Sequence, residues 1–318
     1  MEQSISGSLR ASNPCGVLTS FFYYKTYDFS KIPDSVPLLL DSGAFSAYTQ
    51  GKVIDIEAYI EWCQALEGRY DFAFNLDELG DEKTSLERWE YLTAAGVETA
   101  PVIHYGSKPE NVLPAYLEQG ADIIAFGGLV GSGANAQAVG WSSYVLKWLE
   151  ENAPQVRTHG LGVHGSSRLA RLPFTTIDSS SPTAAFKFAR LPIYNAITHK
   201  WQTIALNGKE IYRHRKLLEV YGMTPEKVAV SNPTTRADLA YLLAISEITG
   251  TEAYRRKMGR ERTSYNILPA SHQGSEYLKN LRRSYLATTS TPILGEYAAS
   301  LHADYLSQNN LHTDKETN

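Results

Sequence analysis

Short apolar runs that end in glycine, aspartate or serine recur through the first two hundred residues. In chain order they read GVLTSFFYY, VPLLLDSG, YDFAFNLDE, VETAPVIHYG, ADIIAFGG, VRTHGLGVHG, LPFTTIDSS and, as the weakest of the set, WQTIALNG. Apolar runs of this length with turn-forming residues at their ends are typical of buried β-strands. The pattern therefore predicts eight strands.

Helical patterns lie between several of these runs. Residues 55–67, DIEAYIEWCQALE, repeat apolar residues at the spacing of one helix face. Residues 82–95 and 109–119 read similarly, and WSSYVLKWLEENAP predicts a helix that ends at Pro154. Alternating strands and helices predict parallel strands joined by right-handed crossovers. We expect an α/β fold of the (β/α)8 TIM-barrel type, with an open doubly wound sheet as the alternative.

The last hundred residues follow a different pattern. The segments KEIYRHRKLLEVYGMTPEKV and TTRADLAYLLAISEITGTEAYRRKMG predict helices that alternate with no strand. We expect residues 1–208 to form the barrel and residues 209–305 a mostly helical elaboration of it. The polar segment 306–318 is expected to be disordered.

The composition of the chain indicates in which cellular compartment the protein is found. The chain has 318 residues, of which 43% are hydrophobic, and only two are cysteines, Cys15 and Cys63. Two distant cysteines form neither a disulfide framework nor a zinc knuckle, and they fit a reducing compartment. Neither a membrane-spanning run of eighteen apolar residues nor the apolar core of a signal peptide is found. We therefore expect a cytoplasmic protein, with its oligomeric state left open.

Charge is distributed unevenly along the chain. Residues 1–180 contain 12 Lys and Arg against 22 Asp and Glu, a net −10, whereas residues 181–318 contain 18 against 12, a net +6. The total of −4 argues against nucleic acid, but clusters of basic residues in the second part are the kind that bind phosphate. Ordinary solvated helix faces are the alternative. The candidate contacts are Arg213, Arg215, Lys216, Arg255, Arg256 and Lys257.

Polar residues follow nearly every predicted strand. In barrels of this kind catalysis takes place at the carboxyl ends of the strands, so these residues are the candidate site. Helix capping is the competing explanation for the acidic ones. The candidates are Asp41, Ser42, Asn75, Asp77, Glu78, His104, Gly127, Gly128, His159, His164 and Asp178.

Paired carboxylates across a small pocket suit double displacement at a sugar carbon. One carboxylate attacks the anomeric carbon, and the other manages the proton of the leaving group, as in retaining glycosidases. The second carboxylate needs a pKa near neutrality. A third carboxylate accepts hydrogen bonds from the N–H donors of a purine edge. Glycines at a strand end allow a flat ring to approach the backbone.

Four segments resemble the tRNA-guanine transglycosylase superfamily. DSGAFS resembles its Asp-Ser-Gly-Gly-Phe motif, FGGLVGSG its Ile-Gly-Gly-Leu segment, NLDE its base-reading Asp-Glu segment, and TTIDSSSP lies where its nucleophilic aspartate is expected. The most similar variant is the phage-type 7-deazaguanine DNA transglycosylase. The resemblance covers residues 36–180.

The resemblance implies a role for each residue that matches a motif. Asp178 would be the nucleophile, Asp41 the acid/base, and Asp77 the group that grips the purine edge. The predicted base pocket also contains Ser42, Gly43, Phe45, His104, Gly127, Gly128 and Leu129. His104 occupies the position at which the tRNA enzymes have glutamine, and Phe45 and Tyr105 are candidates for stacking on the base or for ordinary core packing.

One departure from the family favours DNA over RNA as the substrate. The tRNA enzymes carry a zinc site of three cysteines and one histidine, which two cysteines before residue 64 do not form. The basic region after residue 195 is a candidate replacement for gripping a nucleic-acid backbone. We expect guanine exchange on DNA, with a free 7-deazaguanine base as co-substrate and no cofactor or metal.

Two alternatives remain open at this stage. One is the same chemistry on tRNA, or hydrolysis of the N-glycosidic bond without exchange. The other is a catalytically inactive barrel that binds nucleic acid. A metal site at His104, His159, His164 and Asp178 lacks a recognisable ligand spacing.

Overall fold

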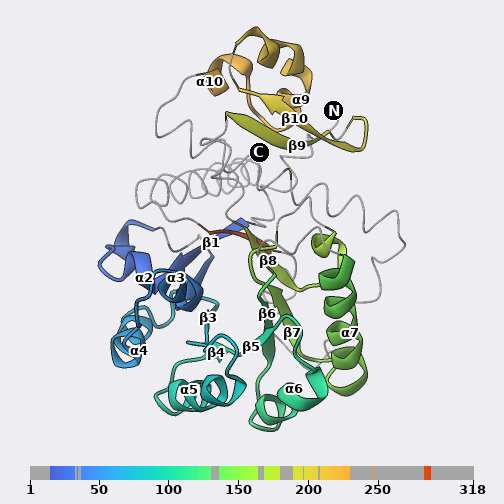
Figure 1. Ribbon diagram of the computed structural model, residues 1–318. Coiled ribbons are helices and arrows are strands. Elements are labelled where there is room, and N and C mark those ends of the chain that lie inside the picture. The colour runs from blue at the N-terminus through green and yellow to red at the C-terminus, as the bar shows by residue number, and fades with distance from the viewer. Residues whose placement is uncertain are drawn as a thin grey trace, which may run out of the picture.

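The computed structural model describes residues 15–32, 34, 37–129, 136–163, 168–179, 189–195, 197–206, 208–229, 246 and 283–287. Over these residues the chain is a mixed α/β protein built on a parallel sheet (Figure 1). The strands are β1 (Cys15–Ser20), β2 (Leu38–Asp41), β3 (Phe72–Phe74), β4 (Thr99–Ala100), β5 (Val102–His104), β6 (Ile123–Gly127), β7 (Arg157–Gly160), β8 (Thr176–Ser179), β9 (Arg190–Asn195), β10 (Lys200–Ala205) and β11 (Arg283–Ala287).

The helices fall between the strands, as the sequence pattern predicts. The α-helices are α2 (Phe21–Tyr24), α3 (Ala44–Thr49), α4 (Ile56–Ala65), α5 (Glu82–Ala94), α6 (Pro109–Glu118), α7 (Ala136–Asn152), α9 (Arg215–Val220) and α10 (Pro225–Ala229). Short 3₁₀ helices are η1 (Phe29–Lys31), η2 (Leu169–Arg171) and η3 (Lys209–His214). Figure 1 shows α4, α5, α6 and α7 in an arc outside the strands.

Local sequence explains where the main helices begin. The Asp55 side chain accepts a hydrogen bond from the Glu57 N–H at the start of α4, and Asp81 accepts one from the Thr84 N–H at the start of α5. Pro109 occupies the first turn of α6, where its missing N–H is tolerated. The structure confirms the four helices predicted before residue 154, which are α4, α5, α6 and α7.

Nine strands form one sheet in the order β4-β3-β2-β1-β11-β8-β7-β6-β5, and every pairing in it is parallel. Seven predicted segments supply all of its strands except β11, and one of those segments contains both β4 and β5. The expected α/β class is therefore confirmed. Closure of the barrel stays a prediction at this point.

The prediction that the eighth segment belongs to the parallel sheet is wrong. Lys200–Ala205 is a strand, but it pairs antiparallel with β9 in a separate two-stranded sheet. Arg283–Ala287 lies instead between β8 and β1, with Tyr285 opposite Asp178 on one side and Gly16 on the other. Since β11 comes from the range expected to be mostly helical, the parallel sheet takes strands from both sides of residue 208. The division into domains stays a prediction.

The expected helix over residues 209–228 is interrupted. The chain forms η3, α9 and α10 in succession, with turns between α9 and α10 at Tyr221 and Gly222, where Gly222 has φ +74°. Figure 1 shows these elements beside the β9–β10 hairpin. The expected helix over 234–259 and the expected disordered tail lie outside the described residues, apart from helical Ser246.

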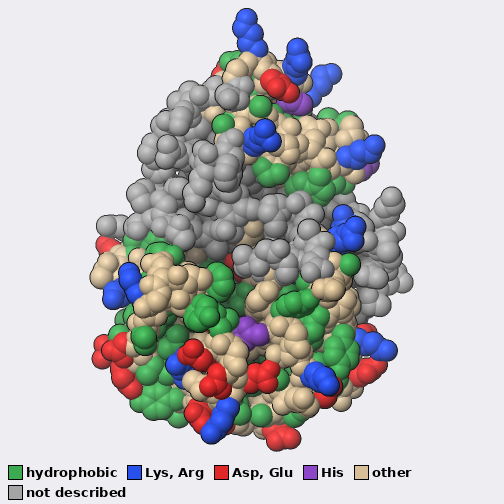
Figure 2. Space-filling model, viewed as in Figure 1, with side chains coloured by type: hydrophobic (Ala, Val, Ile, Leu, Met, Phe, Trp, Pro, Cys, Tyr) green, Lys and Arg blue, Asp and Glu red, His purple; other side chains and the backbone are tan. Residues whose placement is uncertain are grey.

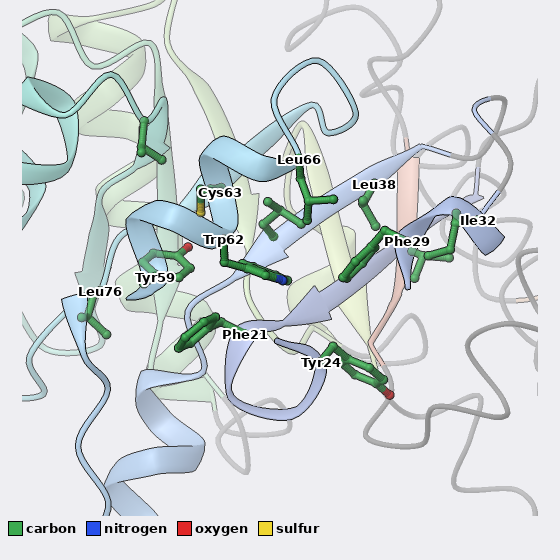
Figure 3. Close-up of a cluster of buried hydrophobic side chains, with 14 of the residues drawn as sticks. Phe21, Tyr24, Phe29, Ile32, Leu38, Tyr59, Trp62, Cys63, Leu66 and Leu76 are labelled. Atoms are coloured by element: carbon green, nitrogen blue, oxygen red, sulfur yellow. The ribbon is translucent and has the colours of Figure 1, made fainter. Parts of the chain in front are cut away.

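Aromatic side chains bind α2, η1 and α4 to the outer face of the sheet (Figure 3). Phe21 packs edge-on against both Tyr59 and Trp62, with ring centroids 5.6 and 5.5 Å apart, and Phe29 contacts Trp62. Tyr59 is fully buried and its hydroxyl donates to the Phe74 carbonyl. This cluster fixes the start of α2, and so the segment directly after β1.

None of the helices within the described ranges combines the length and the apolarity that a membrane crossing requires.

A second cluster of side chains fills the inner face of the sheet. It contains residues of β1 to β6, namely Leu18, Leu39, Phe72, Phe74, Ala100, Val102, Ile123 and Ala125. His159 of β7 packs against the rings of Phe72 and Phe74 of β3, with centroids 5.9 and 4.9 Å away. Because β3 and β7 are far apart in the strand order, this contact shows that the sheet is strongly curved.

Candidate active site

The predicted acidic residues come together at one edge of the sheet. Asp41 ends β2, Asp178 lies in β8 next to its last residue, and Asp77 follows β3 by three residues. The strands are parallel, so their carboxyl ends lie at the same edge. His104 ends β5 and Gly127 ends β6 at this edge as well, and these two residues are opposite each other in the strand register.

Asp41 has an unusual acidity. Burial, the largest cause, raises the pKa of its carboxyl from 3.8 to about 7, against the opposing effect of a hydrogen bond from the Gly43 N–H. The negative charges of Asp178 and Asp77 raise this pKa further. At neutral pH the Asp41 carboxyl is therefore present in both its protonated and ionised forms. The same electrostatic coupling indicates that the three aspartates share one site.

Asp178 is buried and held by two groups. The Gly162 N–H donates to Asp178 Oδ1 over 2.8 Å, and His159 Nε2 lies 3.2 Å from the same oxygen. Only 5% of the Asp178 surface is exposed. Both of these hydrogen bonds go to Oδ1.

His159, a candidate to which the sequence assigned no role, contacts Asp178. It is fully buried, and its Nδ1 lies 2.7 Å from the Thr176 hydroxyl. An ionised carboxylate only accepts hydrogen bonds, so we infer that His159 Nε2 carries the hydrogen and that Nδ1 accepts from Thr176. The sequence places a histidine next to the last residue of the strand that precedes Asp178, but its contact with Asp178 depends on the register that places His159 beside Thr176.

Asp77 pairs with His104. The distance from His104 Nε2 to Asp77 Oδ2 is 2.7 Å, and both side chains are largely buried. Its neighbour Glu78 instead forms an ion pair with Arg88, at 2.8 Å. The N-cap of α5 is Asp81, so neither Asp77 nor Glu78 caps that helix.

Ser42 and Gly43 shape the turn after β2. The buried Ser42 hydroxyl donates to the Asn75 carbonyl and accepts from the Ala44 N–H. Gly43 has φ +80°, and a Cβ there would lie 2.4 Å from Ser20 Oγ and 2.5 Å from Phe22 Cβ. The Ser42 hydroxyl is therefore used in hydrogen bonds to backbone groups. Gly43 is the N-cap residue of α3, and Asp41 is the last residue of β2.

The remaining predicted pocket residues differ in position. A Cβ on Gly127 would lie 2.7 Å from Val102 Cγ1 and 3.2 Å from His104 Cδ2, so this glycine lets the strand pass close to His104. Gly128 lies against Tyr105, and Leu129 is buried in the core beneath α7. Phe45 is 56% exposed and lies on α3, outside the core. Tyr105 packs edge-on against Trp141 at 5.6 Å.

The remaining candidates are Asn75, the predicted basic contacts and His164. Asn75 is buried, and its side-chain amide donates to the Ser85 carbonyl and so fixes the loop before α5. Arg213 and Lys216 are exposed on η3 and α9, while Arg215 forms ion pairs with Glu219 and Glu226. His164, Arg255, Arg256 and Lys257 lie outside the described residues. Within the described ranges, no group of three or more His, Cys, Asp or Glu is arranged to hold a metal ion.

Comparison with models of known protein families gave no match, and a search of curated protein sequences gave none either.

Proposed function

We propose that the parallel sheet is a closed (β/α)8 barrel. Its two outermost strands in the pairing order, β4 and β5, are separated in the chain by Pro101 alone. The Ala100 carbonyl accepts from the Asn75 N–H beyond β3, and the Pro101 carbonyl accepts from the Ala125 N–H of β6. Residues 99–104 then form a single strand with a neighbour on each side, and eight strands complete the circle.

We further propose that the protein exchanges guanine in DNA for a 7-deazaguanine base. One observation carries this proposal: a carboxyl with a pKa of about 7, Asp41, lies within electrostatic reach of Asp178 and Asp77. Double displacement at a nucleoside carbon needs a nucleophile, an acid/base near neutrality and a group that reads the base. The three aspartates supply these functions in the roles that the resemblance assigns to them.

In the first half of the reaction, Asp178 attacks C1′ of the deoxyribose. A bond forms between Asp178 Oδ2 and C1′, and the bond from C1′ to the guanine nitrogen breaks with its electron pair on guanine. Asp41 in its protonated form gives its proton to the departing guanine. The products are a covalent sugar–Asp178 intermediate, free guanine and an ionised Asp41.

In the second half, the incoming base takes the place of guanine. Asp41, now a carboxylate, accepts the proton from the ring nitrogen of the 7-deazaguanine, and this nitrogen forms the new bond to C1′. The bond from C1′ to Asp178 breaks, and its electron pair returns to the carboxylate. The same residue thus acts as acid and then as base, which a pKa of about 7 suits in both directions.

The base would bind between Asp77 and Gly127. Guanine and 7-deazaguanines present N–H donors on one edge, which the Asp77 carboxylate accepts. His104, at 2.7 Å, holds that carboxylate in place. Gly127 and Gly128 bring backbone close to the ring without a side chain in the way. DNA is the proposed acceptor because two cysteines do not form the zinc site of the tRNA enzymes.

The proposal is tested by guanine exchange. Purified protein is incubated with radiolabelled guanine and either unmodified DNA or unmodified tRNA. Label is expected in DNA for the wild type and in neither nucleic acid for Asp178→Ala. Asp122→Asn is the matched control, since Asp122 is an exposed carboxylate that pairs with Arg157 at the amino end of β6. Label in tRNA would move the acceptor to RNA, and label in neither would overturn exchange.

A further inference from the structure

Exposed aromatic side chains gather on two short helices next to Asp41. Tyr23 on α2 is 38% exposed, and Phe45 and Tyr48 on α3 are 56% and 64% exposed. The two helices are in contact, since the Gln50 amide directly after α3 donates to the Tyr23 hydroxyl. Single exposed aromatic residues are common on protein surfaces, but three on adjoining helices are a patch.

The position of this aromatic patch relates it to the site. α2 begins directly after the last residue of β1, and α3 begins three residues after Asp41. Gly43 and Phe22 lie so close that a side chain on Gly43 would collide with the Phe22 Cβ. The patch therefore lies at the same edge of the sheet as the three aspartates, beside the acid/base.

A basic side chain, Lys52, borders the patch. The Lys52 ammonium lies 5.4 Å from the centroid of the Phe22 ring, and the Phe22 ring packs edge-on against Tyr23 at 4.9 Å. Figure 2 shows hydrophobic side chains, with basic ones close by, over the area of α2 and α3 in Figure 1.

We infer that Tyr23, Phe45 and Tyr48 form a stacking platform for the nucleotides that flank the target guanine. This inference rests on the proposed function. Aromatic rings with interspersed lysines are the surface that unpaired nucleic acid uses, because every base has a face to stack and every phosphate a charge to neutralise. A guanine that enters the pocket leaves its neighbours without a stacking partner. The platform offers them one at the rim.

The chain's rigidity at this place supports the inference. Phe21 and Tyr24, the other two residues of α2, are buried in the aromatic cluster of Figure 3. The helix thus has one face fixed in the core and the other, with Phe22 and Tyr23, directed outward. A preorganised aromatic surface loses little conformational entropy when a base stacks on it.

Binding of a guanine-free oligonucleotide tests the platform separately from exchange. The probe is a fluorescein-labelled single strand of thymidines with one 2-aminopurine, whose fluorescence changes when it stacks. Phe45→Ala and Tyr48→Ala are each expected to weaken binding by about 5-fold to 100-fold and to remove the 2-aminopurine signal. Both residues are exposed, so thermal unfolding is expected at the wild-type temperature. Tyr91→Ala is the matched control, an exposed tyrosine on α5, and is expected to bind as the wild type does.

Each outcome has one meaning. Unchanged binding in Phe45→Ala and Tyr48→Ala, with exchange intact in the wild type, overturns the platform and leaves the proposed function standing. Weakened binding without any exchange by the wild type overturns the proposed function, and it leaves Phe45 and Tyr48 as a stacking surface for single-stranded nucleic acid without a target guanine. A wild type that binds no oligonucleotide overturns the platform. Loss of a dimer in sedimentation, with oligonucleotide binding unchanged, would assign the patch to a second copy of the chain instead.

Discussion

His159 Nε2 lies 3.2 Å from Asp178 Oδ1, and both side chains are buried. Thr176 contacts the other ring nitrogen of the histidine at 2.7 Å, and the ring packs against Phe72 and Phe74. A nucleophile in a covalent mechanism must present one oxygen along a narrow path to C1′. The pair fixes Oδ1 and thereby orients Oδ2.

Replacing His159 by phenylalanine should slow formation of the covalent intermediate. The ring keeps its packing against Phe72 and Phe74 but loses the donor to Asp178, and a small misplacement of a reacting group costs about 100-fold in rate. His159→Gln, which returns an N–H donor, is expected to recover part of the loss. Single-turnover kinetics measure the effect, with thermal unfolding as the check on folding. A rate unchanged in both variants would remove His159 from a positioning role.

The contribution of Asp41 to the free energy of unfolding should fall as the pH rises through the range from about 4 to 7. Asp41 has a pKa of 3.8 when unfolded and about 7 when folded. Between these values the folded chain binds a proton that the unfolded chain has released, so the free energy of unfolding decreases with pH. Asp41→Asn lacks this group. Between pH 4 and pH 8 its free energy of unfolding should therefore rise relative to that of the wild type by roughly 3–5 kcal/mol.

Urea unfolding at several pH values measures that difference. Asp81→Asn serves as a control of opposite sign, because hydrogen bonds from Thr84 lower the pKa of the exposed Asp81. The wild type should gain stability over Asp81→Asn as the pH rises through the acidic range. A difference between Asp41→Asn and the wild type that does not vary with pH would contradict the burial of the Asp41 carboxyl.

The pH dependence of the first half-reaction should follow Asp41. Departure of guanine requires the protonated carboxyl, so the rate of intermediate formation is expected to decline about tenfold per pH unit above about 7. Stopped reactions at pH 6 to 9 with a guanine-containing oligonucleotide supply the profile. Asp41→Asn should abolish the decline together with most of the rate. A rate that rises steadily to pH 9 would exclude Asp41 as the acid.

Gly127→Ala should weaken binding of the base more than it destabilises the fold. The new Cβ would lie 2.7 Å from Val102 Cγ1 and 3.2 Å from His104 Cδ2, which displaces His104 from Asp77. We expect a KM for the base raised about tenfold and a free energy of unfolding lowered by about 1–3 kcal/mol, the usual cost of overpacking.

Gly140→Ala provides the comparison. Gly140 is an exposed helical residue of α7 with open space around it. Alanine there should raise the free energy of unfolding by about 0.5–1 kcal/mol and leave the KM unchanged. Equal KM values for Gly127→Ala and the wild type would show that Gly127 does not border the base.

The strands that could be predicted are those whose own residues define them. LLLD, FAF and IIAFG are apolar runs that are buried on both sides, and the polar residues that follow them meet at one edge because parallel strands share their direction. Arg283–Ala287 was not predicted because RSYLA lies in a range whose sequence pattern predicts helices, and its pairing with β1 and β8 is what makes it a strand. WQTIALNG was correctly predicted as a strand, but it pairs antiparallel with β9 instead of joining the parallel sheet.

The same distinction applies to the site. Asp41, Asp77 and Asp178 are recognisable because each directly follows or ends an apolar run. The role of His159 depends on the register between β7 and β8, which is a long-range property. Ser42 and Asn75 have the right sequence positions but are engaged in hydrogen bonds to backbone, a use that residue type alone does not distinguish from substrate binding.

The central claim is that Asp178 forms a covalent bond to the sugar, and intact mass spectrometry tests it most directly. The protein is incubated with a short guanine-containing DNA oligonucleotide without an incoming base, denatured at low pH and weighed. We predict a protein whose mass is increased by that of the oligonucleotide minus guanine, with the adduct located by peptide mapping on the segment containing Asp178 and absent in Asp178→Asn. An adduct of equal amount in Asp178→Asn, or exchange without any adduct, would contradict it.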